Sequence, residues 1–173
     1  MKVFTLISAA LSIVLTGCSM KNRTDEIPAV SNFELPRYMG TWYEIARYPH
    51  SFEKGLHYVT ADYSVRSDGK IRVLNRGVNE KGKVRVAEGV AVPNGKTGTG
   101  ELKVSFFRPF YGAYRVIYLS PDYDLAIVTS STKDYLWILS RRKQLTEKEK
   151  MLCLEKLAEW GFDPAKLIMV DQN

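Results

Sequence analysis

Apolar and polar residues alternate in short runs through the middle of the chain, and turn residues separate these runs at regular intervals. Alternation with a period of two gives a β-strand one apolar face and one polar face. The connections are mostly of hairpin length, so the pattern predicts sequential antiparallel strands. The runs lie at residues 42–48, 58–65, 71–78, 84–92, 101–107, 112–120, 123–130 and 134–141.

This all-β pattern favours an eight-stranded antiparallel up-and-down barrel, because closure leaves no unpaired edge strand. A barrel of this size has an interior just wide enough for one small ligand. Residues 165–170 are apolar again and predict a short final strand. No repeat or second domain is apparent.

Between the barrel and the final strand, residues 146–162 follow a helical period. Thr146 and Glu149 have the spacing of a capping box, and Gly161 stands where a helix commonly ends. We therefore expect a C-terminal helix that packs on the barrel wall. The residues expected on its packed face are Met151, Leu154, Leu157 and Ala158.

The N-terminus combines Lys2 with an apolar run that is shorter than the roughly 20 residues needed to span a membrane. This layout is typical of a secretory signal peptide, here residues 1–17. The signal ends in Leu-Thr-Gly-Cys, residues 15–18, which resembles the bacterial lipobox. The resemblance implies that Cys18 is acylated and becomes the first residue of a mature lipoprotein, held in the membrane by its acyl chains.

Residues 18–35 are polar, contain Pro28 and have no apolar period, so we predict a lipidated tether followed by one domain over residues 36–173. Ser19 follows the acylated position. By resemblance to enterobacterial lipoprotein sorting, a serine there implies the outer membrane, with the domain facing the periplasm.

Charge and cysteine content narrow the classes of protein. Loss of Lys2 with the signal lowers the formal net charge from +6 to +5, and no basic cluster of the kind that binds nucleic acid is present. Cys153 is the one thiol left once Cys18 is acylated, so an intrachain disulfide is excluded. The sequence offers no metal-ligand spacing, cofactor motif or activated nucleophile, so we predict no metal, no cofactor and no catalytic residue.

Three blocks of sequence resemble the lipocalin family. They are GTWYEIARYP at 40–49, YDLAIV at 123–128 and WILSRR at 137–142, and the resemblance extends over about residues 36–171. The best match is the subgroup that includes bacterial outer-membrane lipoproteins and apolipoprotein D. The resemblance implies a structural motif of Gly40, Trp42 and Arg141, in which the arginine stacks on the indole at the barrel floor. Arg142 is the alternative for the arginine.

Strand parity gives the residues expected to face a ligand. If Arg141 faces the floor, alternate residues of the same strand and the apolar parity of its neighbours point into the barrel, provided that no bulge reverses the alternation. The opposite parity, which carries Arg72, Arg76, Arg85, Lys103 and Arg115, should face solvent. The residues predicted to bind ligand are Trp137, Tyr114, Tyr135, Phe106, Val104, Val73, Asn75 and Val116, and others of the inward parity are Ile71, Val84, Val86, Leu102, Tyr118 and Leu139.

An apolar interior with a few polar groups suits a fatty acid or lysophospholipid, bound for storage or transport in the cell envelope. Two alternatives are an enzyme that uses Glu44 or an inward tyrosine on a lipid-like substrate, and a structural lipoprotein whose barrel is filled by its own side chains. Asp62 and Glu88 are further acidic residues that could face inward.

The aromatic segment 105–114 fits either a barrel plug or an exposed surface that contacts lipid or forms a homodimer.

Overall fold

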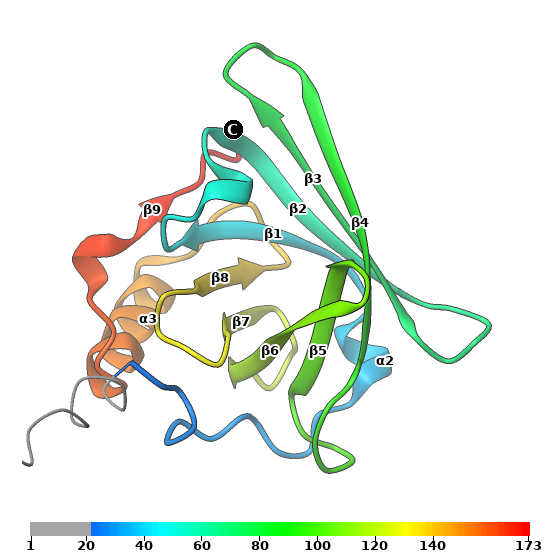
Figure 1. Ribbon diagram of the computed structural model, residues 1–173. Helices are drawn as coiled ribbons and strands as arrows, with labels where there is room; N and C mark the ends of the chain where they lie inside the picture. The colour runs from blue at the N-terminus through cyan, green and yellow to red at the C-terminus, as the bar shows by residue number, and fades with distance from the viewer. Residues whose placement is uncertain (1–21) are drawn as a thin grey trace, which may run out of the picture.

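The computed structural model describes residues 22–173, in which one antiparallel sheet closes on itself (Figure 1). Each strand pairs with the next, and β1 pairs with both β8 and β2, so the predicted eight-stranded up-and-down barrel is confirmed. The signal peptide and Cys18 lie outside the described residues. The strands are β1 (Gly40–Arg47), β2 (Leu56–Val65), β3 (Ile71–Asn79), β4 (Val84–Pro93), β5 (Glu101–Phe107), β6 (Phe110–Leu119), β7 (Leu125–Thr129) and β8 (Leu136–Ser140).

The C-terminal strand β9 (Ile168–Met169) pairs with β1 where β1 and β2 are no longer paired. β1 pairs with β2 only as far as Tyr43, and β9 then pairs with Ala46 and Arg47 on β1. Beyond β9, the buried side-chain amide of Gln172 donates to the carbonyl oxygens of Glu44 and Val59, at 2.8 Å each. A buried carbonyl without a donor is costly, so the chain end stabilises the point where β1 and β2 separate.

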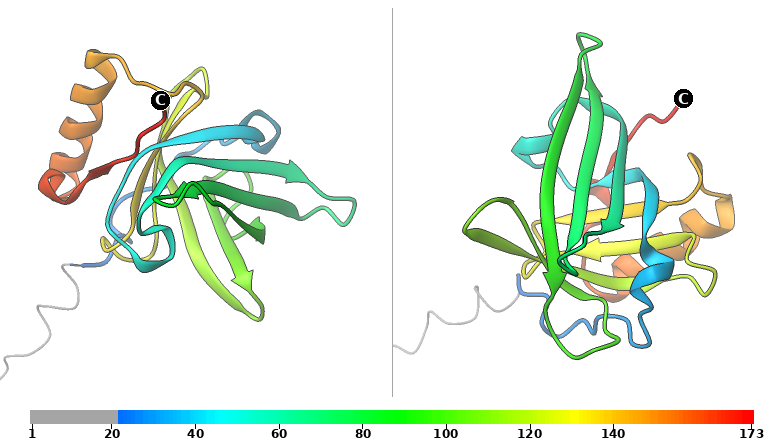
Figure 2. Two further views of the ribbon diagram at one scale, coloured as in Figure 1. Left: turned by 90° about the horizontal axis from the view of Figure 1, so that it is seen from above. Right: turned by 90° about the vertical axis from the view of Figure 1, so that its right-hand side faces the viewer.

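Helix α3 (Glu147–Glu159) packs on the outside of the barrel, where Figure 2 shows it in orange. The predicted capping box between Thr146 and Glu149 is present, and Gly161 has a φ of +67° just after the helix, a conformation that favours glycine. The predicted packed face is wrong in part. Leu157 is buried as expected, but its buried partner is Cys153, whereas Met151, Leu154 and Ala158 are exposed.

The apolar residues form two clusters, one on each side of the barrel wall. The inner cluster includes Trp42, Ile71 and Val116. The outer cluster joins Ile45 and Ile127 of the wall to Leu157 and other residues of the C-terminal segment. Within residues 22–173, no helix is long and apolar enough to cross a membrane.

The floor of the barrel is closed by helix α2 (Leu35–Tyr38), Trp42 and Arg141. Trp42 is fully buried, and its indole nitrogen donates to the carbonyl oxygen of Tyr38 at 2.9 Å. The Arg141 guanidinium carbon lies 4.0 Å from the centre of the Trp42 ring. Arg142, the alternative from the sequence, instead forms ion pairs with Glu149 and Asp124 on the surface.

Residues 22–34, which we call the N-terminal strap, lie along the barrel although they belong to the segment predicted as a tether (Figure 1). Thr24, Ile27 and Phe33 are buried. The prediction that Arg115 faces solvent is wrong, because its guanidinium donates to the carbonyl oxygens of Thr24 and Ile27. Hydrogen bonds to the backbone hold this segment, and they leave no periodic apolar signal in the sequence.

Two short 3-10 helices connect the longer elements. Helix η1 (Ser51–Glu53) lies between β1 and β2 at the barrel end opposite the floor, and η2 (Pro164–Lys166) leads from α3 to β9. The strap begins at Asn22, whose side chain donates to Asp134 in the β7–β8 loop. Both η1 and this loop border the open end.

We expect Trp42→Ala to lower the free energy of unfolding by about 3–5 kcal/mol, because a fully buried tryptophan leaves a large cavity and removes the surface on which Arg141 stacks. Urea denaturation measures this change. Arg142→Ala is the matched control at the neighbouring arginine and should cost less than about 1 kcal/mol, since its ion pairs are exposed. Equal losses in the two variants would contradict the assignment of the floor.

Candidate functional site

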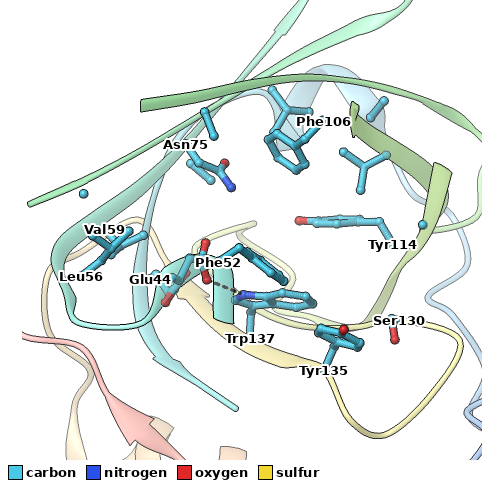
Figure 3. A pocket seen from close by; sticks show the side chains of 18 of the residues that line it. Glu44, Phe52, Leu56, Val59, Asn75, Phe106, Tyr114, Ser130, Tyr135 and Trp137 are labelled. Atoms are coloured by element: carbon cyan, nitrogen blue, oxygen red, sulfur yellow. Dashed lines mark hydrogen bonds between the residues drawn. The ribbon is translucent and has the colours of Figure 1, made fainter. Parts of the chain in front are cut away.

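The barrel encloses a cavity of about 1110 Å³ that opens at the end opposite Trp42. Most side chains that line it are apolar or aromatic, and Figure 3 shows how they converge from both walls. The volume is at or above the roughly 300–1,000 Å³ of typical ligand sites. The alternative of a barrel filled by its own side chains is therefore wrong.

The structure places the residues predicted to bind ligand on the cavity wall, with one exception. Val116 is fully buried in the inner cluster at the packed floor, where Val30 of the strap donates to its carbonyl oxygen, so it does not face the cavity. The residues that do line the cavity are Trp137, Tyr135, Tyr114, Phe106, Val104, Val73 and Asn75, together with Leu102 and Leu139 of the same parity.

The predicted parity of β4 is wrong. Asn75 on β3 faces the cavity, and its cross-strand partner is Ala87. The inward residues of β4 are therefore the odd-numbered ones, including Arg85. Val84 and Val86 lie on the other face and are each 58% exposed, although Val86 still borders the mouth. The apolar residues of this strand project outward, so the assumption that apolar parity faces inward fails here.

A bulge in β6 corrects a second parity prediction. The register of the β6–β7 pairing shifts between Val116 and Tyr118, so Ile117 and Tyr118 both pack with the outer cluster. Tyr118 was predicted to face inward.

A chain of three tyrosine hydroxyls lies at the deep end of the cavity. The Tyr114 hydroxyl is 2.7 Å from that of Tyr38 and 2.9 Å from that of Tyr63. Burial raises the pKa of all three phenols, so they remain neutral and keep their protons. Two hydrogen bonds use two of the three protons, which leaves one hydroxyl able to donate to a further oxygen.

A buried glutamate and a buried arginine are hydrogen-bonded to each other in the cavity wall. A bulge in β1 between Glu44 and Ala46 brings Glu44 and Arg47 to the same side, and their side chains meet at 2.7 Å. Arg47 also donates to the carbonyl oxygen of Glu53 at 2.8 Å. Burial and then the neighbouring Glu53 charge raise the pKa of Glu44 to about 8, against the lowering effect of Arg47.

Glu53 connects η1 to the neighbouring strand β8. Its carboxylate accepts a hydrogen bond from the indole nitrogen of Trp137 at 3.2 Å, drawn as a dashed line in Figure 3. The Nε2 atom of His50 lies 3.0 Å from the same carboxylate, and Phe52 stacks on the His50 ring at 3.8 Å. Sequence reasoning missed this network, although Glu44, Arg47 and Glu53 fall within or beside the GTWYEIARYP block.

The aromatic segment 105–114 divides between the cavity and the surface. Phe106 and Tyr114 point into the cavity in Figure 3. Phe107 and Phe110 border the cavity mouth at the tip of the β5–β6 hairpin, but they are 76% and 72% exposed, and their rings are parallel at 6.3 Å. The interpretation of the whole segment as a plug is wrong for these two rings.

The remaining chemical candidates lie outside the cavity. Asp62 binds Thr41 and Arg76, and Glu88 binds Arg72; neither carboxylate lines the cavity, although Arg76 borders its opening. His57 is part of β2. Burial raises the pKa of the Cys153 thiol to about 12. No group of three or more histidine, cysteine, aspartate or glutamate residues that could hold a metal ion occurs within residues 22–173.

Glu44→Gln should change how stability depends on pH. The raised pKa of Glu44 means that the folded protein binds more protons than the unfolded chain between about pH 4.5 and pH 8, so its contribution to stability is present at low pH and is lost as pH rises. One pKa unit corresponds to about 1.4 kcal/mol. We expect Tm to fall between pH 5 and pH 9 by at least about 2–4 °C more in the wild type than in the variant. Equal falls, measured by calorimetry, would contradict the buried acid.

Comparison with known proteins gives full-length matches. Residues 33–172 match the family model described as a lipocalin-like domain. The chain is 44% identical to "Outer membrane lipoprotein Blc" of Escherichia coli K12, covering 99% of this chain and 98% of that protein. It is 48% identical to the protein of the same name from Vibrio cholerae, covering 94% and 95%.

A solved structure with the same fold is insecticyanin from Manduca sexta, with a TM-score of 0.69, 23% identity and coverage of 84% of each chain. At that identity the likeness concerns the fold alone. The match to the family model spans the barrel, helix α3 and strand β9, and the relatives match over nearly the whole chain. This chain therefore belongs to the lipocalin family.

Proposed function

We propose that this protein is a lipid-binding lipocalin that holds one fatty acid or lysophospholipid inside its barrel, for storage or transport in the cell envelope. The observation that carries the proposal is the open cavity of about 1110 Å³, lined mainly by apolar and aromatic side chains. Such a site buries a long acyl chain favourably, at roughly 0.8 kcal/mol for each CH₂ group.

The location in the proposal is the outer membrane, on its periplasmic side, with anchoring through acyl chains on Cys18. Support comes from the lipobox-like residues 15–18, from Ser19, and from the relatives named as outer membrane lipoproteins. Two or more acyl chains are needed for a stable anchor, because one chain binds a membrane only marginally.

A binding role fits the cavity better than catalysis. Glu44 is the acidic side chain in the wall that resembles a general base, but its carboxylate is already held by Arg47 at 2.7 Å. The tyrosines at the deep end bind each other, and burial raises their pKa values, so none is an activated nucleophile. We propose no nucleic-acid partner. We further propose a homodimer, with the exposed Phe107 and Phe110 as its contact surface.

Mass spectrometry of lipids extracted from purified protein without its signal peptide tests the proposal directly. We expect a stoichiometric single-chain lipid. Protein that carries no lipid, and that shows no fluorescence change with long-chain fatty acids or lysophospholipids, would contradict it.

Trp137→Ala should weaken binding of a long-chain fatty acid about tenfold, because the indole lies on the cavity wall and supplies contact area to an acyl chain. The free energy of unfolding should fall by about 1.5–3 kcal/mol, the worth of a hydrogen bond to a carboxylate such as that of Glu53. Isothermal titration and urea denaturation measure the two effects.

Trp160→Ala is the matched control for that experiment. Trp160 packs against the outer cluster and does not line the cavity, so its replacement should leave the affinity unchanged. If Trp160→Ala weakens binding as much as Trp137→Ala does, the cavity is not the binding site.

Cys18→Ser should abolish acylation and leave a precursor that is not processed normally, because the thiol is the proposed site of lipid attachment. Fractionation of cells and intact-mass measurement report the outcome. Ser19→Ala is the control, since it leaves the thiol in place. Outer-membrane Cys18→Ser protein that still carries acyl-chain mass would refute the anchor.

A further inference from the structure

The open end of the cavity carries positive charge on its inner face. On the β3–β4 hairpin, Arg85 pairs across the ladder with Gly77, and both residues line the cavity. Gly77 has no side chain to cover the guanidinium. Lys54, at the end of η1, lines the same opening.

These cations differ from the other basic residues of the hairpin. Arg72 forms an ion pair with Glu88 at 2.7 Å on the outer face, and Arg76, which also borders the opening, forms one with Asp62 at 3.2 Å. Arg85 has neither a hydrogen bond nor an ion pair with any residue in the described part of the chain. The opening therefore presents an arginine whose donors are available to a ligand.

The acidic side chains of the cavity are buried in its wall, whereas Arg85 and Lys54 are exposed. Glu53 accepts a hydrogen bond from Trp137, and Glu44 is held by Arg47. A ligand anion placed against that buried wall would lie near the Glu53 carboxylate in a poorly solvated environment, which is costly. The same anion near Arg85 meets opposite charge with water still available.

The wall between these positions suits an alkyl chain. Below Arg85 the inward residues of β4 are Ala87, Gly89 and Ala91, which are small, and Asn75 and Val73 face the cavity beside them. The aromatic side chains of Phe106, Tyr114 and Trp137 approach from the other strands (Figure 3). A single chain can therefore lie along β4 with its head at the opening.

We propose that Arg85, assisted by Lys54, forms an anion-binding rim that selects single-chain lipids with a carboxylate or phosphate head and orients them chain-first in the cavity. This inference rests on the proposed lipid-binding function and adds the residues that bind the head group and the direction of the ligand.

The test compares three ligands with the same oleoyl chain: lysophosphatidic acid, oleic acid and the uncharged monooleoylglycerol. Arg85→Gln should weaken binding of both anionic ligands about three- to tenfold, as expected for one partly exposed ion pair, and should change monooleoylglycerol binding less than twofold. Raising the salt concentration should weaken anionic binding in the wild type and have less effect in the variant.

Lys83→Gln is the matched control, because it removes the same charge from the same hairpin at an exposed residue that does not line the cavity. It should leave all three affinities unchanged. A loss confined to lysophosphatidic acid would support the rim and identify phosphate as its preferred head, and a loss confined to oleic acid would identify carboxylate.

Three results would overturn the inference: equal weakening of all three ligands by Arg85→Gln, no weakening of any, or an equal effect of Lys83→Gln on the anionic ligands. Each of these leaves the proposed function standing if the wild type binds monooleoylglycerol. Failure of the wild type to bind any of the three ligands would instead refute the lipid-binding function itself. Melting temperatures of the two variants establish that both remain folded.

Discussion

Closure of one end of the barrel is the constraint on which the other features depend. Arg141 stacks on Trp42 and donates to carbonyl oxygens of residues 37, 38, 39, 41 and 123. These hydrogen bonds are partly buried or exposed, and through them one guanidinium connects α2, the start of β1 and the turn before β7. Because this end is sealed, the cavity opens at the other end, and an elongated ligand has a defined inner and outer terminus.

The barrel itself could be predicted because its signals are local. Hairpin turns and two-residue alternation are encoded within each pair of strands, and the capping box and Gly161 fix the ends of α3. Packing against the barrel is not local. The helix could not be oriented from its own period, since Met151 and Leu154 are as apolar as the buried Leu157 but face solvent.

Inside the barrel, prediction failed where alternation breaks or where apolar residues face outward. The β6 bulge reverses Tyr118, and the β1 bulge brings Glu44 and Arg47 together although they are three residues apart. On β4, Val84 and Val86 face solvent, so hydrophobicity predicted the wrong parity and placed Arg85 on the solvent face instead of the cavity face. One inserted residue changes the side on which every later residue of a strand lies. In a strand that extends beyond the packed core, hydrophobicity no longer indicates which side faces inward.

Charge in this barrel is sorted by depth of burial. The carboxyl groups of Glu44 and Glu53 are buried. Arg47 donates to Glu44 and Trp137 donates to Glu53, and the raised pKa of Glu44 allows the wall to avoid a second buried negative charge at neutral pH. These hydrogen bonds, together with that from Arg47 to the carbonyl oxygen of Glu53, fix η1 against β1 and β8. The unpaired cation stands at the opening, where water screens it until a ligand arrives. An apolar interior, a neutralised acidic wall and a basic rim together favour a chain that enters first and a head that stays outside.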